Sequence, residues 1–569
     1  MDRRAIGAIL LMMIIAVVPT FFLKKPAPAV PAAVASDSLG HSADSAAAAV
    51  RATGSARPAA VAAAPSGPDS AAHVADDTVV VRSPLYTYRV STRGARLVGA
   101  ALSHYRSMAP ADSNGVAELV RPGSSLLDVT LLSGRDTLRL DRWAFTPSAR
   151  ALDVSGAGAP LTLTATEGGV TVALTYTFHP DDYQIEVRGQ ARGLPSTGGL
   201  AIVSLGSGIR NTESDTVQNH QAAALVTKSR NGDAHRIDFS SLKPGIPDTV
   251  SGPFEWVAVK SKYFVTALLA FDSTSGGVTG AQALAPVTPE KRPTSADVRA
   301  SVVVPASGAF GYTLYAGPLE YSRLSRVGHG FDDVNPYGWP GFRTIIRPVA
   351  IAVRSLLVWM HVHLHLPYGL VLTSFGILVR LLLWPLNQKA MRASMQMQAI
   401  QPLMKQLQDR HKEDPQKQQQ EMFKLYKEHK VNPLGGCWPM LLPMPVLLAL
   451  FFVFQNTIEL RGAPFLWLPD LSQPDPLFII PLLMGLSMFG LTKVGQMGME
   501  PNPQMKMTMY LMPVVMTFVF LKFASGLNLY YAVSNVASIP QQWLLARERV
   551  RRAARMIVEI KTKDPRARV

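Results

Sequence analysis

The sequence predicts a polytopic α-helical membrane protein with six spans, joined to an exported antiparallel β-sandwich. Only 17% of its 569 residues are charged, against about 25% in a typical soluble domain. Five long apolar runs lie in the last 200 or so residues. Residues 77–320 instead show the period-two alternation of apolar side chains that is typical of strands.

The amino-terminal segment 1–25 is predicted to be a membrane anchor. Its apolar run of residues 5–23 follows Arg3 and Arg4 and is long enough to cross a hydrocarbon layer of about 30 Å. A cleaved signal peptide remains an alternative, but its apolar core would be shorter. Residues 26–76 are mostly Ala, Pro, Ser and Gly, a composition that cannot bury a core, so we expect a disordered tether.

Segment 77–320 is predicted to be the β-sandwich. Its clearest strands are Val170–Phe178 and Tyr183–Val187, and the sequence His179–Asp182 between them has turn chemistry, which indicates a hairpin. We find no catalytic motif in this segment, and we expect no enzyme activity from the chain.

Segment 368–545 holds the other five predicted spans, at 368–386, 438–458, 477–491, 507–523 and 527–545. Loop 387–436 carries nine basic and five acidic residues, and the tail 546–569 carries nine basic and three acidic residues. Loop 459–476 has only Arg461 as a basic residue. By the positive-inside rule both termini are cytoplasmic and the β-sandwich is exported.

Arg380 lies inside the predicted span 368–386. A charge at that depth costs about 2.5 to 3.5 kcal/mol, so it should face the bundle interior or water. Helical spacing places it on one face with four other residues, namely Thr373, Gly376, Trp384 and Asn387. We therefore predict a water-accessible groove with one fixed positive charge. The alternative is an arginine that extends toward cytoplasmic phosphates.

Segment 388–431 is predicted to be a cytoplasmic helical hairpin. Met391, Met395 and Met422 are candidate contacts for apolar clients, because methionine adapts to many apolar surfaces. Packing within the hairpin explains each methionine equally well.

Segment 321–367 is predicted to contain an amphipathic helix in the outer membrane interface, since Arg343, Arg347 and Arg354 share one face. His361, His363 and His365 follow without a carboxylate, and the chain has one cysteine, Cys437. We therefore predict no metal site and no cofactor. No glycine is followed directly by lysine, which excludes a phosphate-binding loop.

Several motifs resemble those of the bacterial YidC membrane protein insertases of the Gram-negative type. The most specific is Asn432–Pro439, and further matches run through the whole chain except the tether. They include Lys262–Phe264, Leu314–Pro318, Tyr337–Trp339, Glu459–Arg461, Ala463–Phe465, Asp470–Ser472, Met512–Pro513, Ser525–Leu527, Leu529–Tyr531 and Ser534–Asn535. One departure is Pro443, where relatives often have glutamine.

This resemblance implies a five-helix insertase core, a periplasmic β-sandwich and a location in the cell inner membrane. The groove arginine of the family matches Arg380. With Pro443 in place of the glutamine, we place the polarity of the substrate groove on Arg380, Gly376 and Thr373 together with Tyr531 and Asn535. The implied partners are nascent membrane proteins, the lipid bilayer, the Sec translocon, and the ribosome through the cytoplasmic loops and basic tail; no DNA is implied.

Two other functions remain open from the residues alone. Arg380 would also suit a transporter of small anions, although such folds usually show internal repeats, which we do not find here. The exported segment would also suit an enzyme or sugar-binding module, although it lacks a G-x-S-x-G motif.

Overall fold

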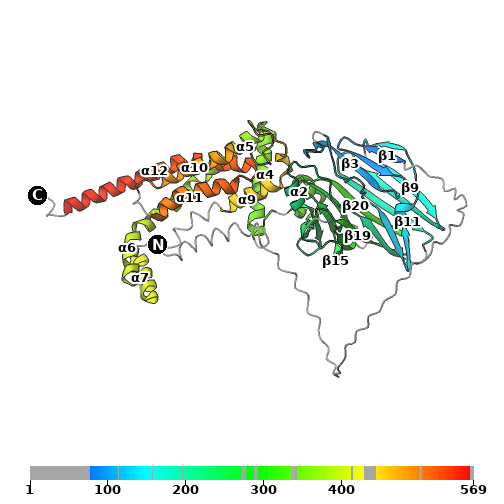
Figure 1. Cartoon of the computed structure of the whole chain (residues 1–569), viewed down its shortest axis with the longest axis horizontal. Coiled ribbons are helices and arrows are strands. Elements are labelled where there is room, and N and C mark those ends of the chain that lie inside the picture. Colours follow the sequence, from blue (N-terminus) through cyan, green and yellow to red (C-terminus); the bar gives the residue numbers. More distant parts are fainter. Residues whose placement is uncertain are drawn as a thin grey trace, which may run out of the picture. The chain divides into compact units, whose positions relative to one another are not determined.

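The computed structural model describes residues 77–563, with breaks at 113–114, 157, 195–197, 271–276, 288–291, 336, 339–341, 412–413, 429–443 and 499–502. The predicted anchor 1–25, the whole tether 26–76, Cys437 and the motif Asn432–Pro439 lie outside the described residues. Strands occupy Thr78–Pro318, and long helices occupy Arg343–Lys563 (Figure 1).

Three sheets make up the β region. The five-stranded sheet has the order β4 (Val116–Glu118), β3 (Leu97–Arg106), β2 (Tyr86–Ser91), β1 (Thr78–Arg82), β8 (Ala151–Asp153). The nine-stranded sheet has the order β14 (His235–Asp238), β13 (Ala224–Lys228), β16 (Trp256–Lys260), β17 (Phe264–Leu269), β20 (Ala309–Pro318), β11 (Gln184–Arg192), β10 (Val170–Phe178), β9 (Ala159–Glu167), β7 (Thr146–Pro147). The six-stranded sheet has the order β15 (Asp248–Phe254), β18 (Val278–Leu284), β19 (Asp297–Val304), β12 (Gly199–Ser204), β5 (Val129–Ser133), β6 (Asp136–Arg139). The named strand pairs are antiparallel except β1 with β8.

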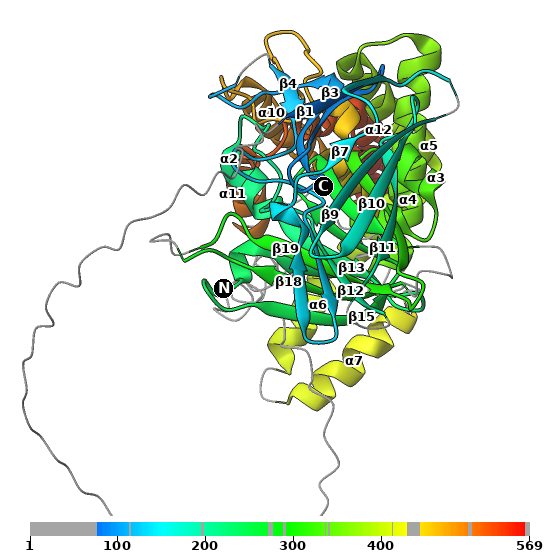
Figure 2. The ribbon, with the colours of Figure 1, turned by 90° about the vertical axis from the view of Figure 1, so that its right-hand side faces the viewer.

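The predicted hairpin is confirmed as β10 and β11, with Phe178 opposite Ile185 and Val172 opposite Ala191. Burial alternates residue by residue along β10, because successive side chains of a strand point to opposite faces. Figure 2 shows β9, β10 and β11 side by side.

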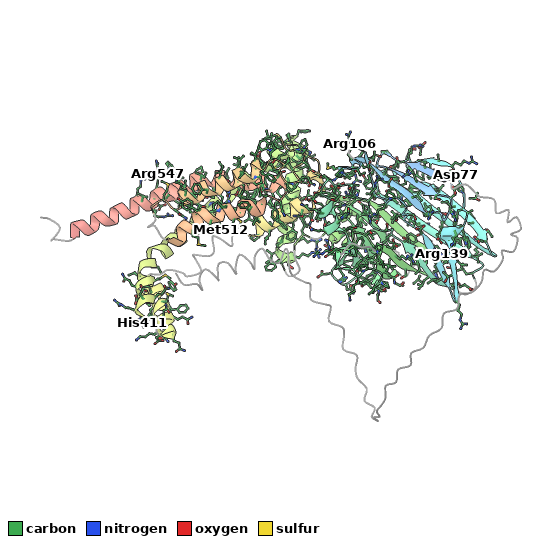
Figure 3. All side chains as sticks on the ribbon, viewed as in Figure 1. Asp77, Arg106, Arg139, His411, Met512 and Arg547 are labelled. Carbon is green, nitrogen blue, oxygen red and sulfur yellow. The ribbon has the colours of Figure 1, made fainter. Side chains whose placement is uncertain are left out.

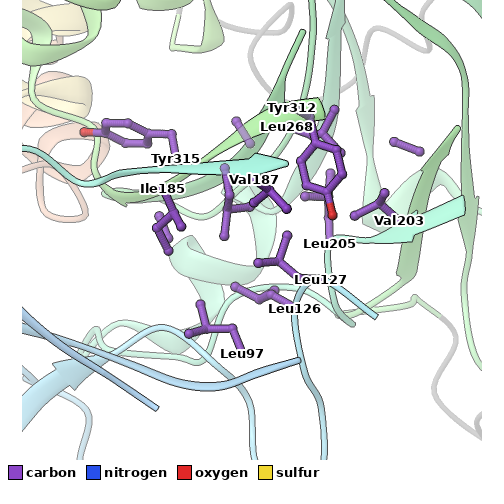
Figure 4. Close-up of a cluster of buried hydrophobic side chains, with 14 of the residues drawn as sticks. Leu97, Leu126, Leu127, Ile185, Val187, Val203, Leu205, Leu268, Tyr312 and Tyr315 are labelled. Atoms are coloured by element: carbon purple, nitrogen blue, oxygen red, sulfur yellow. The ribbon is translucent and has the colours of Figure 1, made fainter. Parts of the chain in front are cut away.

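The β core draws on segments that are far apart in the chain. The side chains of Leu97, Leu126, Val187, Leu205 and Leu268 gather in one buried cluster (Figure 4). Such burial of apolar surface is the main favourable term in folding.

Tyr88 ties the five-stranded sheet to the nine-stranded sheet. Its fully buried hydroxyl donates a 2.9 Å hydrogen bond to the carbonyl of Ala316 on β20, and its ring stacks on Tyr86. Because Tyr88→Phe leaves that carbonyl buried without this donor, we expect it to lower the free energy of unfolding by about 1–3 kcal/mol. Chemical denaturation of the full chain measures the loss. Replacing exposed Val116 by Ala is the control and should change stability by less than ~0.5 kcal/mol.

The helical region begins with α3 (Tyr321–Val327) and α4 (Arg343–Leu364) and continues with α5 (Tyr368–Ala399), α6 (Gln401–Arg410), α7 (Pro415–Glu428), α9 (Met444–Asn456), α10 (Ile479–Gly495), α11 (Pro503–Phe520) and α12 (Ser525–Lys563). Two stretches, Arg343–Leu364 and Tyr368–Gln388, are long and apolar enough to cross a membrane, and α9, α10 and α11 contain shorter apolar stretches.

Two helices extend beyond the predicted spans. Helix α5 contains Pro385 and runs past residue 386 to Ala399, and α12 contains Pro540 and runs past residue 545 to Lys563. The apolar run measures only the part of a helix suited to hydrocarbon, whereas the hydrogen-bonded helix continues into polar sequence. The first arm predicted for the hairpin is therefore partly the end of α5.

Candidate functional site

Arg380 of α5 faces α12. Its Nε donates a 2.7 Å hydrogen bond to the hydroxyl of Ser534. The side chain is half-buried, and among the described residues no carboxylate lies within ion-pair distance of it. The guanidinium is therefore held in place by a neutral partner, and its charge is not compensated by the described part of the chain.

Hydrogen bonds and close packing hold α5 against α12 one turn on either side of Arg380. Gly376 is buried, and a Cβ added there would lie 3.3 Å from Val533 of α12, so the missing side chain allows the close approach. On the other side, Gln541 of α12 donates to the carbonyl of Trp384 over 2.9 Å. The predicted face of α5 is thus the face that meets α12.

The other predicted groove residues have hydrogen-bond or ring partners of their own. Thr373 donates to the carbonyl of Gly369 in its own helix. Asn535 faces α10, where its amide donates to Ser487 over 3.2 Å. The ring of Tyr531 packs edge-on against Phe520 of α11, with centroids 5.1 Å apart. These residues lie on helices around Arg380, and their role in a groove remains a prediction.

The sequence analysis missed Ser534 as the partner of Arg380, and also Gln541. A signal was present, because Tyr531, Ser534, Ser538 and Gln541 are spaced by three, four and three residues and so form a polar stripe on one face of a helix. This stripe faces α5 at two positions, Ser534 and Gln541.

Helices α6 and α7 pack against each other as a helical hairpin. Its turn contains His411 (Figure 3), and Asp414 caps α7 by accepting from the backbone N–H of Lys417 over 3.1 Å. Met422 is half-buried on α7. The side chains of Met391 and Met395 lie outside the described residues.

A second polar cluster, which we call the outer junction, joins the β region to the loop after α9. It contains Glu213, Arg461, Lys260, Asn335 and Asn456. Arg461 Nε lies 3.0 and 2.9 Å from the two carboxylate oxygens of Glu213, and both side chains are almost inaccessible, at 4% and 0%. Lys260 donates to Asn335 over 2.7 Å, and Asn335 donates to the carbonyl of Asn456.

Two lysines are buried here, Lys260 within the outer junction and Lys262 beside it. Burial lowers the pKa of Lys260 well below its usual value, and burial also lowers the pKa of Lys262, although nearby carboxylates, Glu213 first, oppose the shift. Lys262 donates to Gln218 over 2.9 Å. These shifts mean that folding disfavours the protonated lysines.

The free energy of unfolding should therefore rise as pH increases toward the ordinary lysine pKa of about 10.4. A lysine with a lowered pKa binds fewer protons in the folded than in the unfolded chain, so the free energy of unfolding increases as pH rises toward the unfolded pKa. Buried tyrosines such as Tyr263, whose pKa burial raises, oppose this only nearer pH 10. Urea denaturation across this range measures the slope. Lys260→Met should reduce it, and an unchanged slope would contradict the assignment.

The histidines of α4 have local partners. Nδ1 of His361 lies 2.7 Å from the carbonyl of Leu366, and its ring stacks on Tyr368. His363 stacks on Trp359. Among the described residues no group of His, Cys, Asp and Glu has the arrangement of a metal site.

Comparison with known proteins adds independent information. The family profile described as "YidC periplasmic domain" matches residues 78–351, and the profile "60Kd inner membrane protein" matches residues 359–552. A protein named "Membrane protein insertase YidC" from Chlorobaculum parvum is 30% identical over 499 residues, 82% of each chain. Its namesake from Oleidesulfovibrio alaskensis is 31% identical over 83% of this chain and 86% of its own.

The coverage is lower for another relative of the same name. The protein from Chlorobaculum tepidum is 33% identical over 390 residues, and the match spans 65% of this chain and 65% of that protein, just under two thirds of its length. A solved structure titled as an active YidC insertase covers 82% of this chain at 16% identity, with a TM-score of 0.33. The assignment rests on the sequence matches, which cover both the β region and the helices. The chain belongs to the YidC family of membrane protein insertases.

Proposed function

We propose that the chain is a membrane protein insertase and chaperone that moves nascent segments from the cytoplasm into the bilayer through a hydrophilic groove. The observation that carries the proposal is the half-buried Arg380, which has the neutral partner Ser534 and no carboxylate partner in the described part of the chain. Family membership supports the same function.

The proposed topology has six spans, with both termini cytoplasmic and the β region periplasmic in the cell inner membrane. The basic residues of 387–436 and 546–569 support it. We place α4 along the outer interface. Its Arg343 and Arg347 pair with Asp333 and Asp332, and its Arg354 pairs with Glu459, so its polar side is bound to protein rather than exposed to lipid.

In the proposed mechanism an acidic outer tail of the client enters beside Arg380 while its apolar helix moves into lipid. Helix formation satisfies backbone groups that would each cost several kcal/mol unpaired in hydrocarbon. The short apolar stretches of α10 and α11 would thin the bilayer locally. This sequence of steps needs no cofactor and no bond cleavage.

The proposed partners are nascent membrane proteins, the Sec translocon and the ribosome. The two-helix hairpin and the basic tail support a cytoplasmic contact. Met391, Met395 and Met422 are the proposed client contacts there.

Reconstitution tests the proposal. The purified full chain in liposomes should insert a small single-span protein without added nucleotide, whereas empty liposomes should insert much less. Uptake of a small labelled anion, with no insertion, would instead favour the transporter.

A further inference from the structure

Seven aromatic side chains form a continuous chain of ring contacts across the helical bundle, which we call the aromatic layer. It runs from Phe375 of α5 through two residues of α12 to α11, the α11–α12 turn and α9. Successive centroids are 5.1–5.9 Å apart, in the order Phe375, Tyr530, Tyr531, Phe520, Phe523, Phe451, Phe452. Such tilted and edge-on contacts are the favoured arrangements of aromatic rings.

The cytoplasmic side of the aromatic layer is polar. Ser534, the partner of Arg380, follows Tyr530 by four residues on α12, which is about 6 Å along the helix axis. Phe375 precedes Arg380 by five residues on α5. The aromatic layer therefore ends about one helical turn from the Arg380 guanidinium, which stays hydrated in the proposed groove.

The opposite side of the aromatic layer is also polar. Phe451 and Phe523 line a small cavity together with Lys262, Gln218 and Ser472, three residues of the β region and the outer loop. Lys262 and Gln218 are joined there by a 2.9 Å hydrogen bond, and Ser472 is buried beside them.

The geometry points to a further function: the aromatic layer is the barrier that keeps the membrane impermeable to ions and protons while the groove is wet. This inference rests on the proposed function, because it assigns what closes that groove toward the outside. Apolar constrictions stop permeation by excluding water. An ion in transit would have to lose its hydration shell, which is strongly unfavourable in an apolar environment.

The distance between the two polar sides of the aromatic layer agrees with this role. Leu527 lines the outer cavity and Ser534 contacts Arg380. They are seven residues apart on α12, or about 10 Å along its axis. Between them, Tyr530 and Tyr531 carry the rings that connect α12 to α5 and α11.

Proton leak through liposomes containing the full chain tests the inference. A potassium diffusion potential drives protons, and an enclosed pH-sensitive dye reports their entry. Phe520→Ala removes the ring that links α12 to the α11–α12 turn, so we expect proton entry at least tenfold faster than with the unmodified chain. Phe518→Ala is the matched control, because Phe518 lies two residues away on α11 and is 69% exposed. Proton entry with this variant should be as slow as with the unmodified chain.

A second variant shows whether the result with the first arises from misfolding. Phe523→Ala removes another ring of the aromatic layer, in the turn between α11 and α12, and should also make proton entry faster. Proton entry at the unmodified rate in either variant, in a chain that still melts as one cooperative unit, would overturn the inference. Insertion of a single-span client is measured in the same liposomes. If the unmodified chain inserts no client, the proposed function fails, and this result is distinct from the rate of proton entry.

Discussion

Arg380→Ala is expected to slow the insertion of clients with acidic outer tails by about 10- to 100-fold, while clients with neutral tails are much less affected. The magnitude follows from a hydrogen bond to a charged group, which contributes about 1.5–3 kcal/mol, where ~1.4 kcal/mol is a factor of ten. The effect should be large because the described residues offer the guanidinium no competing carboxylate. Initial rates into liposomes, with two clients that differ only in tail charge, provide the measurement.

Two variants separate charge from structure. Arg380→Lys keeps the positive charge and should recover most of the rate with the acidic tail. Ser534→Ala removes the Nε partner but keeps the charge, so it should have a smaller effect that does not depend on the tail. Equal losses for both clients in Arg380→Ala would show that the arginine has a structural role only.

Arg461→Ala is expected to lower the free energy of unfolding by about 3–5 kcal/mol, because it leaves the Glu213 carboxylate buried without its cation. The arginine also donates to the carbonyl of Thr212 over 2.9 Å and packs over the ring of Phe264. Urea denaturation of the full chain in detergent, followed by tryptophan fluorescence, would measure the loss.

The double variant Glu213→Leu with Arg461→Met should recover most of this stability, since replacing both members of a buried pair by apolar residues is often nearly neutral. Arg139→Ala is the surface control, because Arg139 pairs with Asp141 at an exposed site and such pairs contribute only about 0–1 kcal/mol. A similar loss in Arg139→Ala and Arg461→Ala would mean that the outer junction is no stronger than a surface contact.

Local sequence patterns predicted the local structure well. Alternation along Val170–Phe178 predicted β10, and the turn residues after it predicted the hairpin with β11. These features depend on residues close together in the chain. Hydropathy located apolar runs within α5 and α12, but it does not record how far these helices continue into polar sequence.

Long-range contacts could not be predicted from the sequence. The face of α5 that carries Arg380 followed from helical spacing, but its partner Ser534 is 154 residues away. The motifs Lys262–Phe264 and Glu459–Arg461 were noted only as points of resemblance. The structure brings them together, since Arg461 lies over the rings of Tyr263 and Phe264. A distance of 248 residues separates Arg461 from Glu213, and no periodicity in one chain encodes such a pairing.

Helix α12 has 39 residues, a length of about 58 Å, whereas the hydrocarbon layer is about 30 Å thick. In the proposed orientation roughly half of α12 stands in the cytoplasm as a continuation of the same helix that carries Ser534. A molecule that binds the projecting end therefore pulls on the backbone that forms one side of the Arg380 contact. Pro540 lies between the two and removes one backbone hydrogen bond of the helix, so we expect bending under such a pull to concentrate there.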